Sequence, residues 1–193
     1  MRKSREETAQ TRQRIVETGA IELRRKGIDG TGLADVMSAA GLTHGGFYRH
    51  FDSKDALVLE CLANALDSLR ASIETATATR PGRAGVLFAI DDYLSAAHRD
   101  SEATCPFVSL GSELARANEA VRNAATTGFL QLADVIASHF DDLSPAAAKK
   151  EALVLLSSMV GAMTMARLVS DKDASAAILT QMRKALAQQV RRK

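Results

Sequence analysis

Polar side chains suited to contacts with phosphates and with the edges of bases gather close to residue 50. Tyr48, Arg49 and His50 carry hydrogen-bond donors of the kind that contact phosphate oxygens and base edges in nucleic acids. Ser53 and Lys54 follow at the expected start of a helix, where free backbone N–H groups attract anions. This short segment therefore predicts a surface that can bind a nucleic acid.

Two short helices joined by a tight turn are expected to position these side chains. Apolar residues recur at helical spacing over 33–40, which predicts an amphipathic helix. Gly41 is expected to end this helix, because glycine permits a left-handed backbone, and Leu42 can pack between the two helices. Thr43 is a candidate cap for a second helix over 44–50. This is the plan of a helix-turn-helix, whose second helix enters the major groove of DNA.

The second short helix begins almost without side chains, because Gly45 and Gly46 stand there. Glycine costs a helix roughly 1 kcal/mol relative to alanine, which makes sense where a backbone must approach another surface closely. Phe47 and Phe51 lie at helical spacing and are expected to anchor the helix to the protein. A generic packed pair of helices is the alternative, but it would need neither two glycines nor an exposed Tyr48.

The rest of the chain is also expected to be helical, because no segment shows strand-like alternation. One helix is predicted over 8–26, another begins after Ser53, and a break follows at 76–82. Beyond the break we expect helices near 83–97, 106–116, 119–140, 145–169 and 174–191. The prediction is an all-α protein with a three-helix N-terminal helix-turn-helix domain at 1–52 and a C-terminal helical bundle at 53–193.

Composition and charge narrow the possible functions. The net charge of +2 argues against a non-specific DNA-binding protein, which would rely on a strongly basic surface. The absence of a long apolar run and of a secretory signal predicts a cytoplasmic chain with no membrane partner. An enzyme is not expected, because the sequence shows no nucleophile–base pair and no phosphate-binding glycine loop. No catalytic residue, metal site or cofactor is predicted.

The segment from Thr31 to Phe51 and the helix start that follows it resemble the DNA-binding domain of the TetR/AcrR family of transcriptional regulators. The resemblance rests on Thr31, the turn over 39–43, Gly45, the run 47–51 and the pair Ser53-Lys54. The helix over 8–26 also has the family's expected length and position. Residues 157–167 resemble the penultimate helix of many members, although more loosely.

The resemblance implies a homodimer that binds a near-palindromic double-stranded DNA operator. It implies repression as the usual outcome, and release of the operator when a small-molecule effector binds. By position, the residues that would hold phosphates are Thr31, Tyr48, His50 and Lys54. Those nearest base edges would be Thr43, His44, Gly45 and Arg49, with Gly46 beside them. Arg2, Lys3 and Arg5 could form an arm along the DNA backbone, or could simply be solvated charges.

A ligand cavity inside the C-terminal bundle and a dimer interface on its last two helices are also implied by the resemblance. The candidate wall residues, each of which could equally be plain core, are Phe88, Tyr93, Phe107, Phe129, Met159 and Met163. Two stripes of residues at helical spacing are candidates for the interface, and the alternative is that they pack inside one subunit. The stripes are Leu156, Val160, Met163 and Arg167 on one helix, and Ile178, Met182 and Ala185 on the other.

Two cysteines offer a second kind of chemistry. Cys105 precedes Pro106 at a helix start, where the positive end of the helix dipole favours the reactive thiolate. Some family members that sense electrophiles or oxidants resemble this segment. A repressor that senses oxidants or electrophiles through Cys105 is therefore the alternative mechanism. Cys105 could also have no chemical role and be a small buried side chain of the core. Cys61 lies within a predicted helix, and we expect it to pack in the core.

Overall fold

The computed structural model describes residues 5–102 and 104–192, and within these residues it contains helices and loops but no strand. The N-terminal elements, which we call the head, are α1 (Arg5–Lys26), α2 (Leu33–Ala39) and the 3₁₀ helix η1 (His44–Arg49). The long helix α3 (Lys54–Thr77) follows. The remaining helices, which we call the body, are α4 (Arg83–Tyr93), α5 (Ala96–Asp100), α6 (Pro106–Arg116), α7 (Glu119–Ala137), α8 (Pro145–Leu168) and α9 (Lys172–Arg191).

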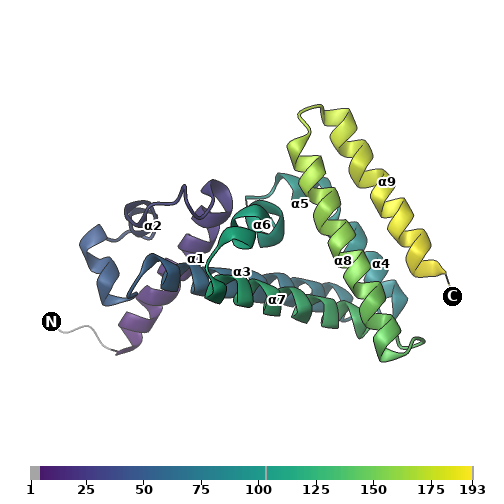
Figure 1. Cartoon of the computed structure of the whole chain (residues 1–193), viewed down its shortest axis with the longest axis horizontal. Coiled ribbons are helices and arrows are strands. Elements are labelled where there is room, and N and C mark those ends of the chain that lie inside the picture. Colours follow the sequence, from purple (N-terminus) through teal and green to yellow (C-terminus); the bar gives the residue numbers. More distant parts are fainter. Residues whose placement is uncertain (1–4, 103, 193) are drawn as a thin grey trace.

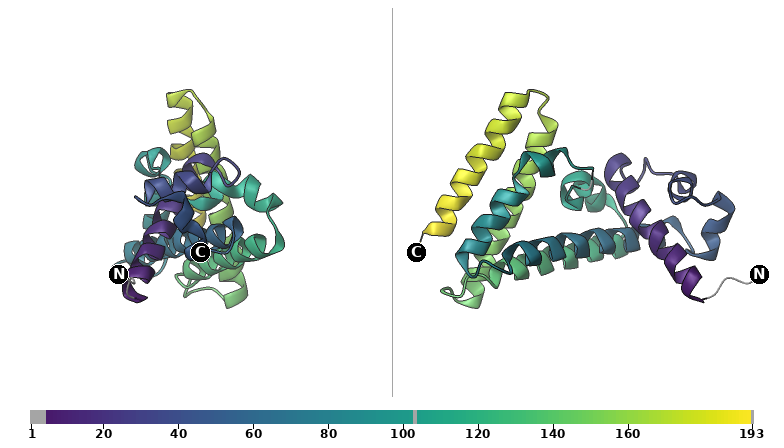
Figure 2. Two further views of the ribbon diagram at one scale, coloured as in Figure 1. Left: turned by 90° about the vertical axis from the view of Figure 1, so that its left-hand side faces the viewer. Right: turned by 180° about the vertical axis from the view of Figure 1, so that it is seen from behind.

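The head lies at one end of the molecule, and α8 and α9 lie side by side at the other (Figure 1). Helix α3 packs against α1 in the head and continues beside α7 in the body, so that it joins the two parts (Figure 2). Helix α6 lies between the head and α8 and contacts both. The predicted all-α fold, with an N-terminal helix-turn-helix and a helical C-terminal bundle, is confirmed. The boundary between 52 and 53 stays a prediction, because α3 runs from one part into the other.

The turn between α2 and η1 has the geometry expected from Gly41. This glycine has a φ of 71°, which is in the left-handed region. Its N–H donates to the carbonyl of Ser38 at 2.9 Å, and the N–H of Leu42 donates to the carbonyl of Met37 at 2.8 Å. Thr43 does precede the second element, but its side chain makes no capping hydrogen bond, and the element is a 3₁₀ helix. The two successive glycines explain this difference, because they disfavour a regular helix.

The body differs from the predicted helices mainly at one position. The single helix expected over 83–97 is two helices, because α4 ends at Tyr93 and α5 begins at Ala96. Ser95 separates them, and its hydroxyl accepts a hydrogen bond from the backbone N–H of His98 at 3.1 Å. A serine at this position can cap a new helix as well as continue an old one. Ser53 and Ser144 precede α3 and α8, and the hydroxyl of each accepts a capping hydrogen bond from a backbone N–H in the first turn of its helix.

Helix α8 is long and apolar enough, by length and composition alone, to cross a membrane. In the structure it packs between other helices of the body and contacts α6, α7 and α9. Leu155, Leu156 and Met163 on its inner face are fully buried. Its apolar character therefore fits a core helix of a bundle.

Candidate nucleic-acid interface and internal cavity

The recognition segment, which we define as residues 43–50, has one buried anchor and several exposed side chains. Phe47 is fully buried, and its ring stacks on that of Phe51 with centroids 5.6 Å apart. The next residue, Tyr48, points outward with 67% of its surface exposed. The edge of Phe47 meets the Tyr48 ring, with centroids 5.2 Å apart. The aromatic pair therefore holds η1 on the protein while the adjacent tyrosine faces solvent.

Arg12 of α1 fixes the end of the recognition segment. Its guanidinium donates hydrogen bonds to the backbone carbonyl of His50 and to the carboxylate of Glu60 on α3. The same guanidinium lies over the ring of Phe51, 4.1 Å from the centroid. The last turn of η1 is thus tied to both α1 and α3, so that its exposed side chains are presented by a rigid support.

Most of the predicted DNA-contact residues are accessible. The exposed ones are Thr43, His44, Gly45, Tyr48 and Arg49, and the half-buried ones are Gly46, His50 and Lys54. A methyl group added at Gly45 would meet no atom within 4 Å, so nothing inside the subunit requires a glycine there. Close approach of an external surface would explain it. Lys54 follows the Ser53 cap at the N-terminus of α3.

Thr31 does not fit the position that the resemblance implied for it. The side chain is 2% exposed, and its hydroxyl donates to the carbonyls of Gly27 at 2.6 Å and Glu22 at 3.2 Å. The hydroxyl satisfies carbonyls at the C-terminus of α1 and is not available to a phosphate. Arg5 begins α1 and is exposed, whereas Arg2 and Lys3 lie outside the described residues.

A cavity of about 460 Å³ opens between α3 and the α4–α5 region of the body. The segment that leads into α6 forms a further wall, with Thr104, Cys105 and Pro106. Of the six residues predicted for a ligand site, Tyr93 alone is among the residues that line this cavity. Arg24, which reaches the cavity from the head, and His98 also line it, and no sequence pattern placed either residue at a ligand site.

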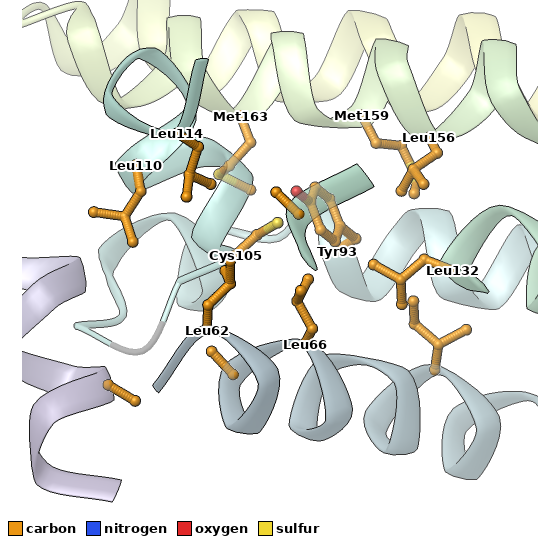
Figure 3. Packing of buried hydrophobic residues seen from close by; sticks show 14 of the residues in the cluster. Leu62, Leu66, Tyr93, Cys105, Leu110, Leu114, Leu132, Leu156, Met159 and Met163 are labelled. Carbon is orange, nitrogen blue, oxygen red and sulfur yellow. The ribbon is translucent and has the colours of Figure 1, made fainter. Parts of the chain in front are cut away.

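The other five predicted wall residues pack elsewhere. Phe88 lies under the guanidinium of Arg80, 3.8 Å from its ring centroid. Phe107 and Phe129 meet edge to face at 5.5 Å. Met159 and Met163 are buried in the core, where Figure 3 shows them on α8, facing the interior. These residues therefore belong to the packing around the cavity and not to its lining.

His98 organises one end of the cavity. Its Nε2 accepts a hydrogen bond from the backbone N–H of Cys105 at 3.2 Å, so that the proton of the neutral ring must be on Nδ1. Nδ1 then donates to the carbonyl of Tyr93 at 2.7 Å. The imidazole also meets the Tyr93 ring edge to face, with centroids 4.5 Å apart. In this arrangement His98 is neutral and joins α4 to the segment that begins α6.

Burial dominates the acidity of both cysteines. Cys105 is 1% exposed, and burial raises the pKa of its thiol, although the hydroxyl of Tyr93 and two backbone N–H groups oppose this. Figure 3 shows the side chains of Cys105 and Tyr93 directed toward one another between α3 and α8. Burial also raises the pKa of Cys61 to about 12. Both thiols are therefore protonated at neutral pH, which agrees with the packing expected for Cys61.

Helix α6 connects the cavity to the head. It begins at the cavity wall, and near its C-terminus Glu113 accepts hydrogen bonds from the backbone N–H groups of Ile28 and Asp29. At the following turn, Asn118 donates to the carboxylate of Asp55 in the first turn of α3 at 2.8 Å. Direct contacts therefore join the helix that begins at the cavity wall to the C-terminal end of α1 and to the start of α3.

The helix-turn-helix head, its exposed recognition segment and the helical body together define a DNA-binding transcription regulator. Residues 15–61 match the model of the tetR family of bacterial regulatory proteins. Residues 89–184 match the C-terminal domain of the LmrA/YxaF-like transcriptional regulators. The chain belongs to the TetR family of transcriptional regulators.

Individual relatives agree with this assignment. The chain is 35% identical over 78 residues to the HTH-type transcriptional regulator TtgR of Pseudomonas putida, which covers 39% of the chain and 37% of the relative. It is 36% identical over 58 residues to the HTH-type transcriptional repressor KstR2 of Rhodococcus jostii, covering 30% of the chain and 28% of the relative. The matched segments thus span 37% and 28% of the length of these two relatives, well under two thirds of each.

Solved structures share the fold over almost the whole chain. A TetR transcriptional regulator from Chloroflexus aurantiacus superposes with a TM-score of 0.82 at 22% identity, covering 97% of this chain and 98% of that one. The reduced form of NemR from Escherichia coli superposes with a TM-score of 0.78 at 20% identity, covering 92% and 95%. At this level of identity the likeness concerns the fold.

Proposed function

We propose that the protein is a cytoplasmic, homodimeric repressor that binds a near-palindromic DNA operator and releases it when a small molecule occupies the body. The observation that carries the proposal is the exposed recognition segment on a rigid support. Phe47 is buried and Arg12 holds the last turn, while Tyr48 and its neighbours face outward. Two such segments in a dimer would reach successive major grooves about 34–36 Å apart.

The second copy would pack on an apolar face of α8. Leu156 and Met163, which the sequence suggested for this interface, are fully buried inside the subunit instead. The outer face carries Val154, Met165 and Leu168, which are 44%, 46% and 73% exposed. Between them Gly161 is exposed, and a methyl group added there would meet no atom within 4 Å. Large apolar side chains on either side of a small residue suit the close approach of a second helix.

Release of DNA would follow from the contacts of α6. A molecule in the cavity touches the segment that begins α6, and Glu113 on the same helix holds the C-terminal end of α1. A shift of α6 would therefore turn the heads and change the distance between the two recognition segments. The ligand must bind the released state more tightly than the DNA-bound state for this shift to occur.

The thiol-based alternative has less support from the geometry. Cys105 is a cavity-wall residue, but it is almost fully buried and its raised pKa keeps it protonated at neutral pH. The chemistry proposed from its place at a helix start needs a thiolate. A reversible ligand is therefore the favoured signal.

Fluorescence anisotropy with DNA from upstream of the chain's own gene, in excess random competitor, tests the main proposal. Specific binding is expected, and equal affinity for random DNA would instead indicate a non-specific DNA-binding protein. Tyr48→Ala should weaken binding to all sequences alike, because a phosphate contact carries no sequence information. His44→Ala should change the preference between operator variants. An equal loss on every operator for His44→Ala would contradict its assignment to base readout.

A further inference from the structure

Arg24 differs from the other basic residues at the end of α1. Arg25 and Lys26 both form ion pairs with Glu22, at 3.0 Å each. Arg24 points to the cavity in the body instead, and within the described residues it forms no ion pair. Its Nε is buried and has no hydrogen-bond partner in the part of the chain that the structure describes. A guanidinium of the DNA-binding head thus stands in the cavity wall without a carboxylate.

The remaining walls do not neutralise this cation. His98 is the neutral tautomer, since both of its ring nitrogens are occupied by backbone groups. Asp92 lines the cavity and is exposed, but it is not within ion-pair distance of Arg24. Arg24 is half-buried, and this partial removal of its guanidinium from water lowers its pKa. A partly buried cation of this kind is stabilised when an anion is placed beside it.

A second polar group in the cavity wall, the hydroxyl of Tyr93, has only a weak partner. Tyr93 is 5% exposed, and its hydroxyl has no conventional hydrogen bond among the described residues. The neighbouring thiol of Cys105 is a weak donor and a weak acceptor. Much of the rest of the lining is apolar, with Leu69 and Ile73 from α3 and Pro106 from α6. The cavity therefore combines a cation that forms no ion pair among the described residues, a weakly bonded hydroxyl and apolar walls.

We propose that this cavity binds a small organic anion, a carboxylate with an apolar body, whose carboxylate pairs with Arg24. The hydroxyl of Tyr93 is the second polar group available to the ligand, and the apolar body packs against the α3 wall. This inference rests on the proposed function, since it names the chemical class of the effector. It also gives the ligand a direct contact with the head, because Arg24 belongs to the last turn of α1.

Matched pairs of compounds test the charge requirement. The probes are 4-phenylbutyrate and 2-naphthoate, each compared with its primary amide, which has nearly the same shape but no charge. Binding to the purified full-length protein is measured by isothermal titration calorimetry. We expect each carboxylate to bind at least about tenfold more tightly than its amide, as a charge-assisted hydrogen bond would give. Equal affinities, or no carboxylate binding at millimolar concentration, would overturn the proposal.

Variants at position 24 test whether Arg24 is responsible for the preference for the carboxylate over the amide. Arg24→Met keeps most of the apolar stem and should abolish the preference for the carboxylate, whereas Arg24→Lys should keep part of it. Arg25→Met is the matched control, because it removes the same charge from the adjacent residue, which does not line the cavity. A preference that survives in Arg24→Met, while the far-ultraviolet circular dichroism shows a folded protein, would refute the inference.

DNA release, measured on the same samples, separates this inference from the proposed function. Carboxylate binding that depends on Arg24 but leaves DNA bound would uphold the inference and contradict release by the effector. Release of DNA by a neutral compound, with no binding of either carboxylate, would uphold the proposed function and refute the inference that the ligand is an organic anion.

Discussion

The carboxylate of Glu113 accepts a hydrogen bond from the backbone N–H of Ile28 at 2.9 Å and thereby ties α6 of the body to the end of α1 in the head. The neighbouring N–H of Asp29 donates to the same carboxylate at 3.3 Å. Gly27 lies directly beneath it, since a methyl group there would come within 2.8 Å of a carboxylate oxygen. The close fit indicates that the distance between the two helices is set at this point.

Glu113→Ala should therefore weaken both stability and coupling. It leaves the N–H of Ile28, which is half-buried, without its acceptor, at a cost of about 1–3 kcal/mol in the free energy of unfolding. It also removes the link through which α6 would move the head. Urea unfolding measures the first effect, and the concentration of effector needed to release DNA measures the second. Ser112→Ala, a change at an exposed residue of the same helix, is the control and should alter neither quantity. Unchanged effector response in Glu113→Ala would contradict the proposed path.

Local patterns predicted the head well. Phe47 and Phe51 are one helical turn apart, and the structure buries both while it exposes Tyr48 between them. The turn at Gly41 could be predicted because glycine adopts a left-handed backbone without steric cost, and Gly41 has this conformation. Thr31 was misplaced because a threonine before a helix suits both a phosphate contact and a local hydrogen bond to carbonyls. Only the packed structure distinguishes these uses.

The cavity and its link to the head could not be predicted in this way. Glu113 and Ile28 are 85 residues apart in the sequence, and no periodicity connects them. Arg24 lies in a basic run that ordinarily ends a helix, so its departure from that pattern depends on where α1 meets the body. Two of the aromatic side chains predicted to line a pocket, Phe107 and Phe129, pack against one another instead.

The open space at Gly45 leads to a prediction that separates DNA binding from stability. Gly45→Ala should leave the free energy of unfolding unchanged or raise it slightly, because the added methyl group meets no atom of the subunit and alanine favours helical backbone. Affinity for the operator should fall by roughly tenfold or more if the methyl group meets DNA at close approach. Thermal unfolding and anisotropy titration measure the two effects. Full operator affinity in this variant would mean that the glycine does not face DNA.

The protonation of Cys105 predicts slow thiol chemistry. Because burial raises its pKa above that of an ordinary cysteine, the reactive thiolate is scarcer at neutral pH than for a free thiol and increases only as the pH rises. In a Cys61→Ala variant, which leaves Cys105 as the only thiol, alkylation by iodoacetamide at pH 7 should be at least about tenfold slower than in the urea-unfolded chain. Cys105→Ser should still release DNA in response to a non-reactive effector. Fast alkylation of the folded protein would instead revive the oxidant- or electrophile-sensing alternative.

The exposed face of α8 predicts how the dimer can be separated without unfolding the subunit. Leu168 is 73% exposed in the single chain, so Leu168→Glu should change the stability of an isolated subunit little. In a dimer that packs on this face, the substitution buries an unpaired carboxylate, which costs several kcal/mol and should raise the dimer dissociation constant by roughly a hundredfold or more. Sedimentation velocity over a range of concentrations measures the shift in the dimer dissociation constant. Operator binding should weaken with it, since one head alone reaches one half-site.

Ile21→Glu is the control, because Ile21 is a similarly apolar residue, 41% exposed, on α1 in the head. It should leave the dimer intact, and a Leu168→Glu protein that stays dimeric would show that the second copy binds elsewhere.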